Sequence, residues 1–140
     1  MTGYSHERAV PHEERVAALL SILQERGYRP LALASDGDRP DVRITDPKRG
    51  TAYIDVKVPQ PNQLRYSIKI GALAEFRRIE TVEHAAVYVV WADNNVDTPD
   101  TLAARIVGGP RRATGNGSAT DWLLVERGGT PFNEFFPVAA

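Results

Sequence analysis

The sequence contains no cysteine, which excludes disulfide bonds, thiolate catalysis and cysteine-ligated zinc together. It also lacks any run of about 18 apolar residues that would cross a bilayer. Its first residues lack the apolar stretch of a secretory signal. From these absences we expect an intracellular, cytoplasmic protein with no membrane segment.

Charge of one sign is not in excess either. The 140 residues include 17 Lys and Arg and 18 Asp and Glu, which gives a net charge of −1. This balance argues against a general nucleic-acid coat protein. It is compatible with an enzyme whose acidic metal site offsets basic surface elsewhere. The length, with a hydrophobic content of 42%, is sufficient for one domain with its own core.

Two other kinds of site find no support in the sequence. The three histidines, His6, His12 and His84, have none of the spacings that bind zinc. The glycine-rich stretch around Gly115 and Gly117 matches no phosphate-binding fingerprint, so we expect a loop there.

The hydrophobic pattern predicts an α/β (α+β) protein with the element order α-β-β-β-α-β-(α)-β. We expect residues 1–11 to be a flexible N-terminal tail and residues 12–140 to form a single domain. A helical repeat of leucine and valine predicts a helix over residues 12–26 that ends at Gly27. The other predicted elements are strands at residues 31–34, 41–44, 52–58, 85–92 and 121–126, helices at residues 64–80 and from Pro99 behind an N-cap at Thr98, a glycine-rich loop at residues 108–120 and a packed or draped tail at residues 130–140.

Two predicted strands, which carry Asp41 and Asp55, are the most informative part of the chain. From Ala52 the second strand alternates apolar residues with Tyr53, Asp55 and Lys57. Because successive side chains of a strand point to opposite faces, we expect the apolar set in a core and the other set on the opposite face. If the two strands form a hairpin, two carboxylates and an ammonium group meet there. Carboxylates of this kind bind Mg²⁺, which takes the rest of its shell from water and phosphate.

With Pro40-Asp41 followed by Asp55-Val56-Lys57, the sequence resembles the PD-(D/E)XK nuclease superfamily. The resemblance implies the restriction-endonuclease-like fold, in which a central mixed sheet is flanked by helices. It implies a Mg²⁺-dependent nuclease, with Mn²⁺ able to substitute, that hydrolyses phosphodiester bonds in DNA. Asp41, Asp55 and the carbonyl of Val56 would be metal ligands, and Lys57 would position or deprotonate the attacking water.

Within that superfamily the layout over roughly residues 12–92 resembles the archaeal-type Holliday junction resolvases. There a Glu near the start of the first helix completes the metal site, which implies Glu13 here, with Glu14 as the second choice. The helix after the lysine strand ends in a similar segment, here Leu-Ala-Glu-Phe-Arg-Arg at residues 73–78. A basic residue at the start of that helix, here Lys69, often supports the site in this superfamily.

Other interpretations of these residues remain open. Asp41, Asp55 and Lys57 are also compatible with a surface salt bridge on a half-exposed hairpin. Arg111 and Arg112 either contact a nucleic-acid backbone or only aid solubility. A family member without activity, serving as a binding or assembly module, and an unrelated α+β protein are the two alternatives for the whole chain. Because one site cuts one strand, cutting both strands predicts a homodimer.

Overall fold

The computed structural model describes residues 3–34, 38–58, 64–112 and 121–139, and for residues 3–11 and 110–112 it describes the backbone alone. Its helices are α1 (Gly3–Glu25), α2 (Ile70–Arg78), the π-helix η1 (Ile79–Glu83) that continues α2, α3 (Pro99–Ala103) and α4 (Phe132–Phe135). Its strands are β1 (Leu31–Ala32), β2 (Val42–Asp46), β3 (Gly50–Lys57), β4 (Tyr66–Lys69), β5 (Ala86–Trp91), β6 (Asn95–Asp97), β7 (Ile106–Arg112), β8 (Asp121–Val125) and β9 (Thr130–Pro131).

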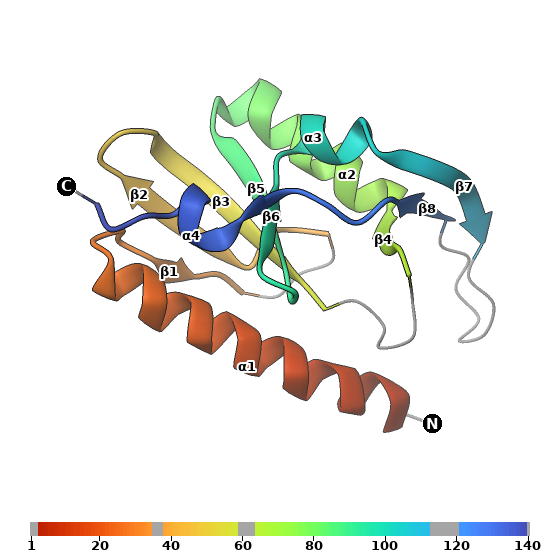
Figure 1. Ribbon diagram of the computed structural model, residues 1–140, viewed down its shortest axis with the longest axis horizontal. Coiled ribbons are helices and arrows are strands. Elements are labelled where there is room, and N and C mark those ends of the chain that lie inside the picture. Colours follow the sequence, from red (N-terminus) through yellow and green to blue (C-terminus); the bar gives the residue numbers. More distant parts are fainter. Residues whose placement is uncertain (1–2, 35–37, 59–63, 113–120, 140) are drawn as a thin grey trace.

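Two sheets make up the β structure. The larger sheet has six strands in the order β1-β2-β3-β5-β6-β9, and the smaller one has the order β4-β8-β7. In the larger sheet β3 and β5 pair in parallel, whereas the other neighbouring strands pair antiparallel. Figure 1 shows α1 along one side of the larger sheet and α2 with α3 on the other. Both faces of the central strands β3 and β5 are therefore covered, which is usual for strands that pair in parallel.

A separate hydrophobic cluster lies on each face of the larger sheet. Beneath α1 and α4, one face carries the cluster Leu19, Leu23, Tyr28, Val42, Ile44, Ala52, Ile54, Val56, Tyr88, Val90, Val96, Phe132 and Phe136. Beneath α2 and the smaller sheet, the other face carries the cluster Tyr66, Ile68, Ala72, Phe76, Ile79, Ala85, Val87, Val89, Trp91, Leu102 and Val125. Alternate residues of β3 and β5 enter different clusters, as the two-residue repeat of a strand requires.

Local sequence signals account for several element ends. Gly27 adopts φ 93°, a conformation that favours glycine, and its N–H donates to the Gln24 carbonyl to end α1. Thr98 caps α3 in a reciprocal pair with Thr101, and Pro99 occupies the first turn. The predicted stop at Gly27 and the predicted cap at Thr98 are both confirmed.

Other predicted elements differ from the structure. The first helix begins at Gly3, so residues 3–11 are helical where we expected a flexible tail. Pro11 lacks an N–H, but α1 continues through it at the loss of that one bond. Residues 66–69, expected in a helix, form β4 because they pair with β8. Residues 108–112, expected in a loop, belong to β7, which also pairs with β8.

We expected a tail at residues 130–140 that is either packed or draped, and the structure shows that it is packed. Its β9 pairs with β6, and Phe132 and Phe136 are buried. Sequence analysis missed β6, β9 and α4, each of which is five residues long or shorter. Within the described ranges, no helix has the length and hydropathy to cross a bilayer.

Candidate active site

Asp41 lies directly before β2, next to the carboxyl-terminal half of β3. Its backbone N–H donates to the Ile54 carbonyl over 2.9 Å. Its Oδ2 accepts a hydrogen bond of 2.8 Å from the Val56 N–H and lies 3.2 Å from His12 Nε2. Asp41 thus connects the start of β2 with β3 and α1. These contacts fix the position of its carboxylate relative to Asp55.

Asp55 and Lys57 lie two residues apart on β3 and therefore share the face that α2 covers. Asp55 is 4% exposed, and Lys57 is partly exposed. The Lys57 Nζ lies 3.0 Å from Asp55 Oδ2. Apart from this ion pair, the buried Oδ2 has no hydrogen-bond partner among the described residues. The ammonium group offsets the carboxylate charge but leaves an oxygen lone pair unused, which is rare for a buried group.

The two carboxyl groups have opposite electrostatic environments. Burial is the main cause that raises the pKa of the Asp55 carboxyl to about 7; nearby Asp41 contributes to the rise, and Lys57 opposes it. Burial alone would also raise the pKa of Asp41. Hydrogen bonds from His12 and the Val56 N–H outweigh it and hold the Asp41 pKa below its ordinary value. The same contact with Asp41 raises the pKa of His12 against the effect of burial. Without a bound cation, two ionised carboxylates so close to each other are unfavourable.

The side chain of α1 that contacts Asp41 belongs to His12, whereas Glu13 is exposed. The sequence favoured Glu13 as the ligand from this helix; the neighbouring His12 could approach the site by its position, but we expected it to be exposed. A signal for His12 was present, because Leu19 and Leu23 lie seven and eleven residues further on and both are buried. At 3.6 residues per turn these three positions share one stripe of the helix, and Glu13 lies about 100° away. Glu13 stays a predicted ligand without a contact to the other two carboxylates.

The residues at this edge fit a metal that takes few protein ligands. Among the described residues, no three His, Cys, Asp or Glu side chains form a metal-binding group. Mg²⁺ usually binds through one or two carboxylates and keeps several waters, so Asp41 and Asp55 meet its requirement. The buried Asp55 oxygen without a hydrogen-bond partner is the observation that fits a metal-ligand role for this carboxylate. The Val56 carbonyl also fits, since the N–H and C=O of one strand residue point to the same neighbouring strand and the N–H points to Asp41.

The three predicted nucleic-acid contacts belong to the smaller sheet. Lys69 is the last residue of β4, and its Nζ lies 5.6 Å from the centroid of the Trp122 ring. The backbone of Arg111 pairs with Trp122, and that of Arg112 pairs with Asp121. The side chains of Arg111 and Arg112 lie outside the described part of the structure. The register places the Lys69 and Arg111 backbones on either side of Trp122.

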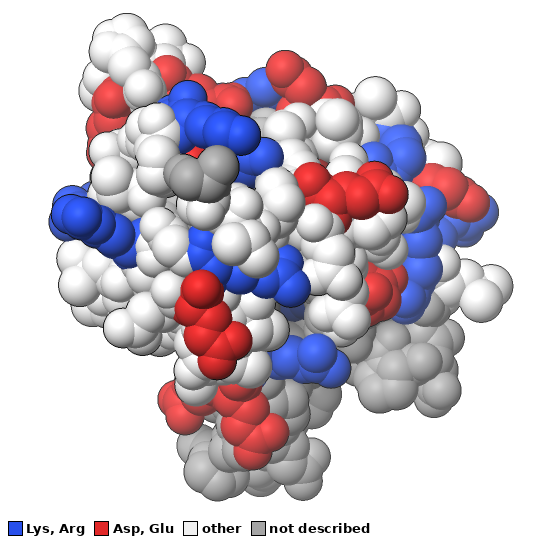
Figure 2. Space-filling model, turned by 60° about the vertical axis from the view of Figure 1, so that its left-hand side comes forward, with Lys and Arg blue, Asp and Glu red and all other residues white. Residues whose placement is uncertain are grey.

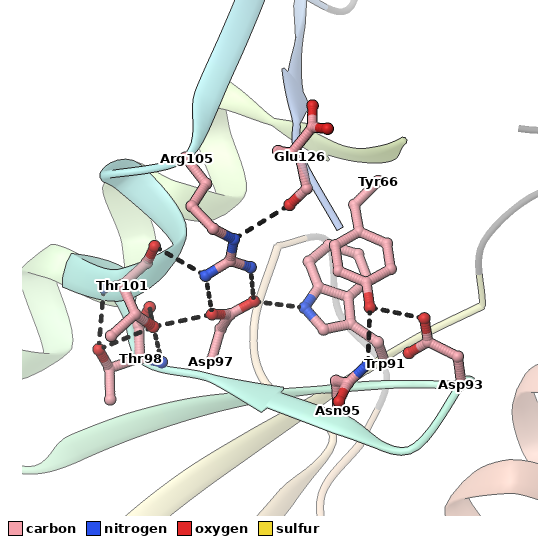
Figure 3. A network of polar contacts seen from close by, with 9 residues as sticks. All are labelled: Tyr66, Trp91, Asp93, Asn95, Asp97, Thr98, Thr101, Arg105 and Glu126. Atoms are coloured by element: carbon pink, nitrogen blue, oxygen red, sulfur yellow. Dashed lines mark hydrogen bonds and ion pairs between the residues drawn. The ribbon is translucent and has the colours of Figure 1, made fainter. Parts of the chain in front are cut away.

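A second buried polar cluster supports the end of β5 (Figure 3). The Asp97 side chain is fully buried, and both its oxygens accept hydrogen bonds of 2.7 Å from the Arg105 guanidinium. Thr101 Oγ1 and Trp91 Nε1 also donate to it, each over 2.8 Å. Trp91, which pairs in register with Lys57, stacks on Tyr66 with ring centroids 3.8 Å apart. Because Asp97 is fully hydrogen-bonded, we regard this cluster as structural.

A mixed sheet covered by helices on both faces, with an Asp, a second Asp and a Lys at one strand pair, defines the restriction-endonuclease-like fold. The chain has this fold, as the resemblance implied. Among solved structures it is similar to Hjc, a Holliday junction resolvase from the archaeal hyperthermophile Archaeoglobus fulgidus, which is a member of the PD-(D/E)XK fold. The TM-score is 0.53 and the identity 15%, over 89% of this chain and 93% of that chain. No family model and no curated protein matches the chain.

Proposed function

We propose that this protein is a Mg²⁺-dependent nuclease that hydrolyses phosphodiester bonds in DNA. The observation that carries the proposal is the buried Asp55 carboxylate. It is next to Asp41, has Lys57 Nζ at 3.0 Å, and keeps one oxygen without a hydrogen-bond partner. A group of this kind in a restriction-endonuclease-like fold is a candidate for catalysis, because structural carboxylates are normally fully hydrogen-bonded.

In this proposal Asp41, Asp55 and the Val56 carbonyl hold Mg²⁺, for which Mn²⁺ can substitute. Glu13 stays a predicted further ligand. The bound cation would supply positive charge to the phosphate and lower the pKa of water. Asp55 supplies an oxygen already removed from bulk water, and the hydrogen bond from Val56 fixes the direction of the Asp41 carboxylate.

Lys57 is proposed to act on the attacking water. Its Nζ is within ion-pair distance of Asp55, and its side chain is partly exposed, so it faces both the carboxylates and solvent. From there an ammonium group can donate a hydrogen bond to water or to a phosphate oxygen as negative charge develops. Holding the attacking water between Lys57 and the phosphate would supply the orientation that the reaction needs.

The test is a cleavage assay on end-labelled DNA of several forms, namely single strands, linear duplex, nicked duplex and a four-way junction. We expect cleavage with Mg²⁺ or Mn²⁺ and none with EDTA. D55N, which has the same shape but no charge, should abolish cleavage, and the exposed control E14A should not. The four-way junction is included because Hjc is a Holliday junction resolvase. Absence of cleavage on every form with either metal would contradict the proposal.

A second candidate function is a binding or assembly module without activity. It is favoured by the absence, among the described residues, of a third acidic or histidine side chain that completes a metal group. In that case the protein would bind DNA with no metal requirement, and Lys57 would act only as the counter-ion of Asp55. Binding without cleavage in the same assay would select this candidate.

We also propose a homodimer, because two copies supply two sites for the two strands of a duplex or junction. C₂ dimers are the commonest oligomers of soluble proteins. Light scattering after size exclusion should give about twice the mass of one chain. A strict monomer would shift the proposed activity toward nicking one strand.

A further inference from the structure

One face of the larger sheet is left open at its β1 edge. Arg43 and Thr45 of β2 are exposed, while their neighbours in the strand are buried. Arg43 pairs in register with Leu31 of β1 and with Tyr53 of β3. Residues directly opposite each other in an antiparallel pair point to the same face. The three therefore form one row across the sheet.

A second row lies beside the first. The Arg29 and Thr45 backbones exchange two hydrogen bonds, of 3.4 and 3.3 Å, and Thr45 pairs in register with Thr51. These three residues are all exposed. We call the two rows together the arginine face; its members are Arg29, Leu31, Arg43, Thr45, Thr51 and Tyr53.

The arginines of this face differ from most others in their ionic partners. Among the described residues, Arg29 and Arg43 have no ion pair, and neither has Arg39, which lines a cavity of about 160 Å³ together with Arg43 and Tyr53. Most of the other arginines whose side chains are described have a carboxylate within ion-pair distance. Figure 2 shows basic and acidic side chains interspersed over one side of the molecule, so pairing rather than abundance distinguishes these arginines.

The two glutamates that line this cavity are already paired elsewhere. Glu75 and Glu83 line the same cavity, but Arg78 binds Glu75 through two hydrogen bonds of 2.8 Å and Glu83 through one of 3.2 Å. Glu83 also accepts the Tyr53 hydroxyl over 3.0 Å. Three arginines, Arg39, Arg43 and Arg78, thus lie around two glutamates, and the surplus of one positive charge is one that a polyanion would complement.

The arginine face and the candidate active site share one strand. Thr51, Tyr53, Asp55 and Lys57 are alternate residues of β3 and so lie on one face of that strand. One two-residue step, about 7 Å in an extended strand, separates Tyr53 from Asp55. Because Tyr53 is half-buried and Asp55 is buried, the open part of the face ends at Tyr53, and phosphates bound there lie on the same side of the sheet as the candidate site.

We propose that the arginine face binds the sugar–phosphate backbone of duplex DNA on one side of the phosphodiester that is cut. The proposal deepens the nuclease function and rests on it for the cutting step. Arg29 and Arg43 donate to phosphate oxygens, and the Thr45 and Thr51 hydroxyls add neutral donors. Contacts of this kind position a duplex without reading its sequence. An acidic protein partner is the competing occupant, and the experiment below separates the two.

The experiment measures DNA binding apart from cleavage. Fluorescence anisotropy with a labelled duplex of about 30 base pairs, in EDTA, gives Kd over a salt series for the wild type and for R29A/R43A. The control is R65A/K48A, which removes two positive charges from exposed positions outside the arginine face. We expect R29A/R43A to raise Kd roughly ten-fold at about 0.1 M salt and to reduce the salt slope by about 2, one unit for each phosphate contact. The control should leave Kd within about three-fold.

The outcomes distinguish the two proposals. If R29A/R43A keeps the wild-type Kd and salt slope while its melting temperature is unchanged, the arginine face is not a DNA surface. If the wild type binds no duplex, the proposed DNA-binding role of the arginine face is also overturned. An acidic protein then becomes the expected partner of this face. If the wild type binds in an Arg43-dependent way but never cleaves, the arginine face stands and the nuclease function fails. Partial recovery of binding in R29K/R43K would support the contact with phosphate.

Discussion

The Val56 N–H donates a hydrogen bond of 2.8 Å to the Asp41 carboxylate. Val56 lies between Asp55 and Lys57. The backbone between these two motif residues therefore fixes the side chain of Asp41, the third residue of the motif. The contact exists because β2 begins only at Val42. Asp41 precedes the ladder, and its side chain takes the place of a backbone acceptor. The Val56 N–H at the end of the β2–β3 pair thus finds an acceptor, and the same hydrogen bond orients Asp41, a candidate metal ligand.

Metal binding should stabilise the fold. Asp41 and Asp55 repel each other when both are ionised, and a bound cation removes that repulsion, so the melting temperature should rise with millimolar Mg²⁺ or Mn²⁺. D55A should abolish the shift, whereas E14A should keep it. Differential scanning fluorimetry with and without metal measures both. A wild-type protein whose melting temperature ignores metal would argue strongly against the site.

Lys57 should matter for turnover and little for metal affinity. K57M keeps the length of the side chain without its charge, and we expect cleavage to fall by about 10²–10⁴-fold, as for other lost charge-stabilising groups. The metal-induced melting shift should remain. Single-turnover cleavage rates and metal titrations of the same preparation separate the two effects. Equal loss of metal affinity would identify Lys57 as a structural counter-ion of Asp55.

His12 and Glu13 should respond differently to truncation. H12A removes the partner of Asp41 at 3.2 Å, and we expect it to cost about 1 kcal/mol of unfolding free energy and to weaken metal binding, because Asp41 loses part of its orientation. E13A removes an exposed side chain and should change neither quantity. Urea denaturation and metal titration of the two variants provide the comparison. If E13A alone lost metal affinity, Glu13 would be a ligand after all.

The ion pair between Asp97 and Arg105 should be one of the costliest contacts to break. R105A leaves a fully buried carboxylate without its main partner, so we expect a loss of about 3–5 kcal/mol in unfolding free energy. R65A breaks an exposed pair with Glu126 and should cost less than about 1 kcal/mol. Equilibrium denaturation of both variants tests the contrast, and equal losses would contradict it.

The same carboxylate predicts a dependence of stability on acid pH. Burial would raise the Asp97 pKa, but the hydrogen bonds from Arg105, Thr101 and Trp91 outweigh it and lower the pKa below its ordinary value. A lowered pKa means that the unfolded chain takes up the proton first. The contribution of Asp97 is then complete above about pH 4, the unfolded pKa, and is lost as the pH falls through the folded value. D97N should flatten this acid limb, which denaturation between pH 2.5 and 6 measures.

Local sequence signals were sufficient where a segment's neighbours in the chain decide its conformation. The glycine stop of α1, the Thr98 cap and the β-branched run of β5 were all predicted, because capping and strand propensity act within a few residues. The alternation along β3 was also visible, since a strand repeats every two residues whatever its partner. That alternation correctly placed Asp55 and Lys57 on one face.

Segments whose partners are distant were not predicted. Ile68, Ala72 and Phe76 follow a helical repeat, but residues 66–69 form β4 because β8, more than fifty residues later, supplies their hydrogen bonds. The glycine-containing β7 is a strand for the same reason. Periodicity alone does not separate a helix from a strand in a short apolar run, and the hydrogen-bond partner decides.

The sequence by itself determined which side chains the candidate site contains: an Asp after Pro40, a second Asp and a Lys two residues later, on strands that alternate correctly. Only the tertiary structure decided their environment. Burial in the folded chain raises the pKa of Asp55. The side of α1 that faces the larger sheet presents His12 rather than Glu13 to Asp41. Arg78 pairs with both Glu75 and Glu83, and Arg43 is left without an ion pair. Burial, helix rotation and the choice of ionic partner depend on contacts between segments far apart in the chain, and no local pattern encodes them.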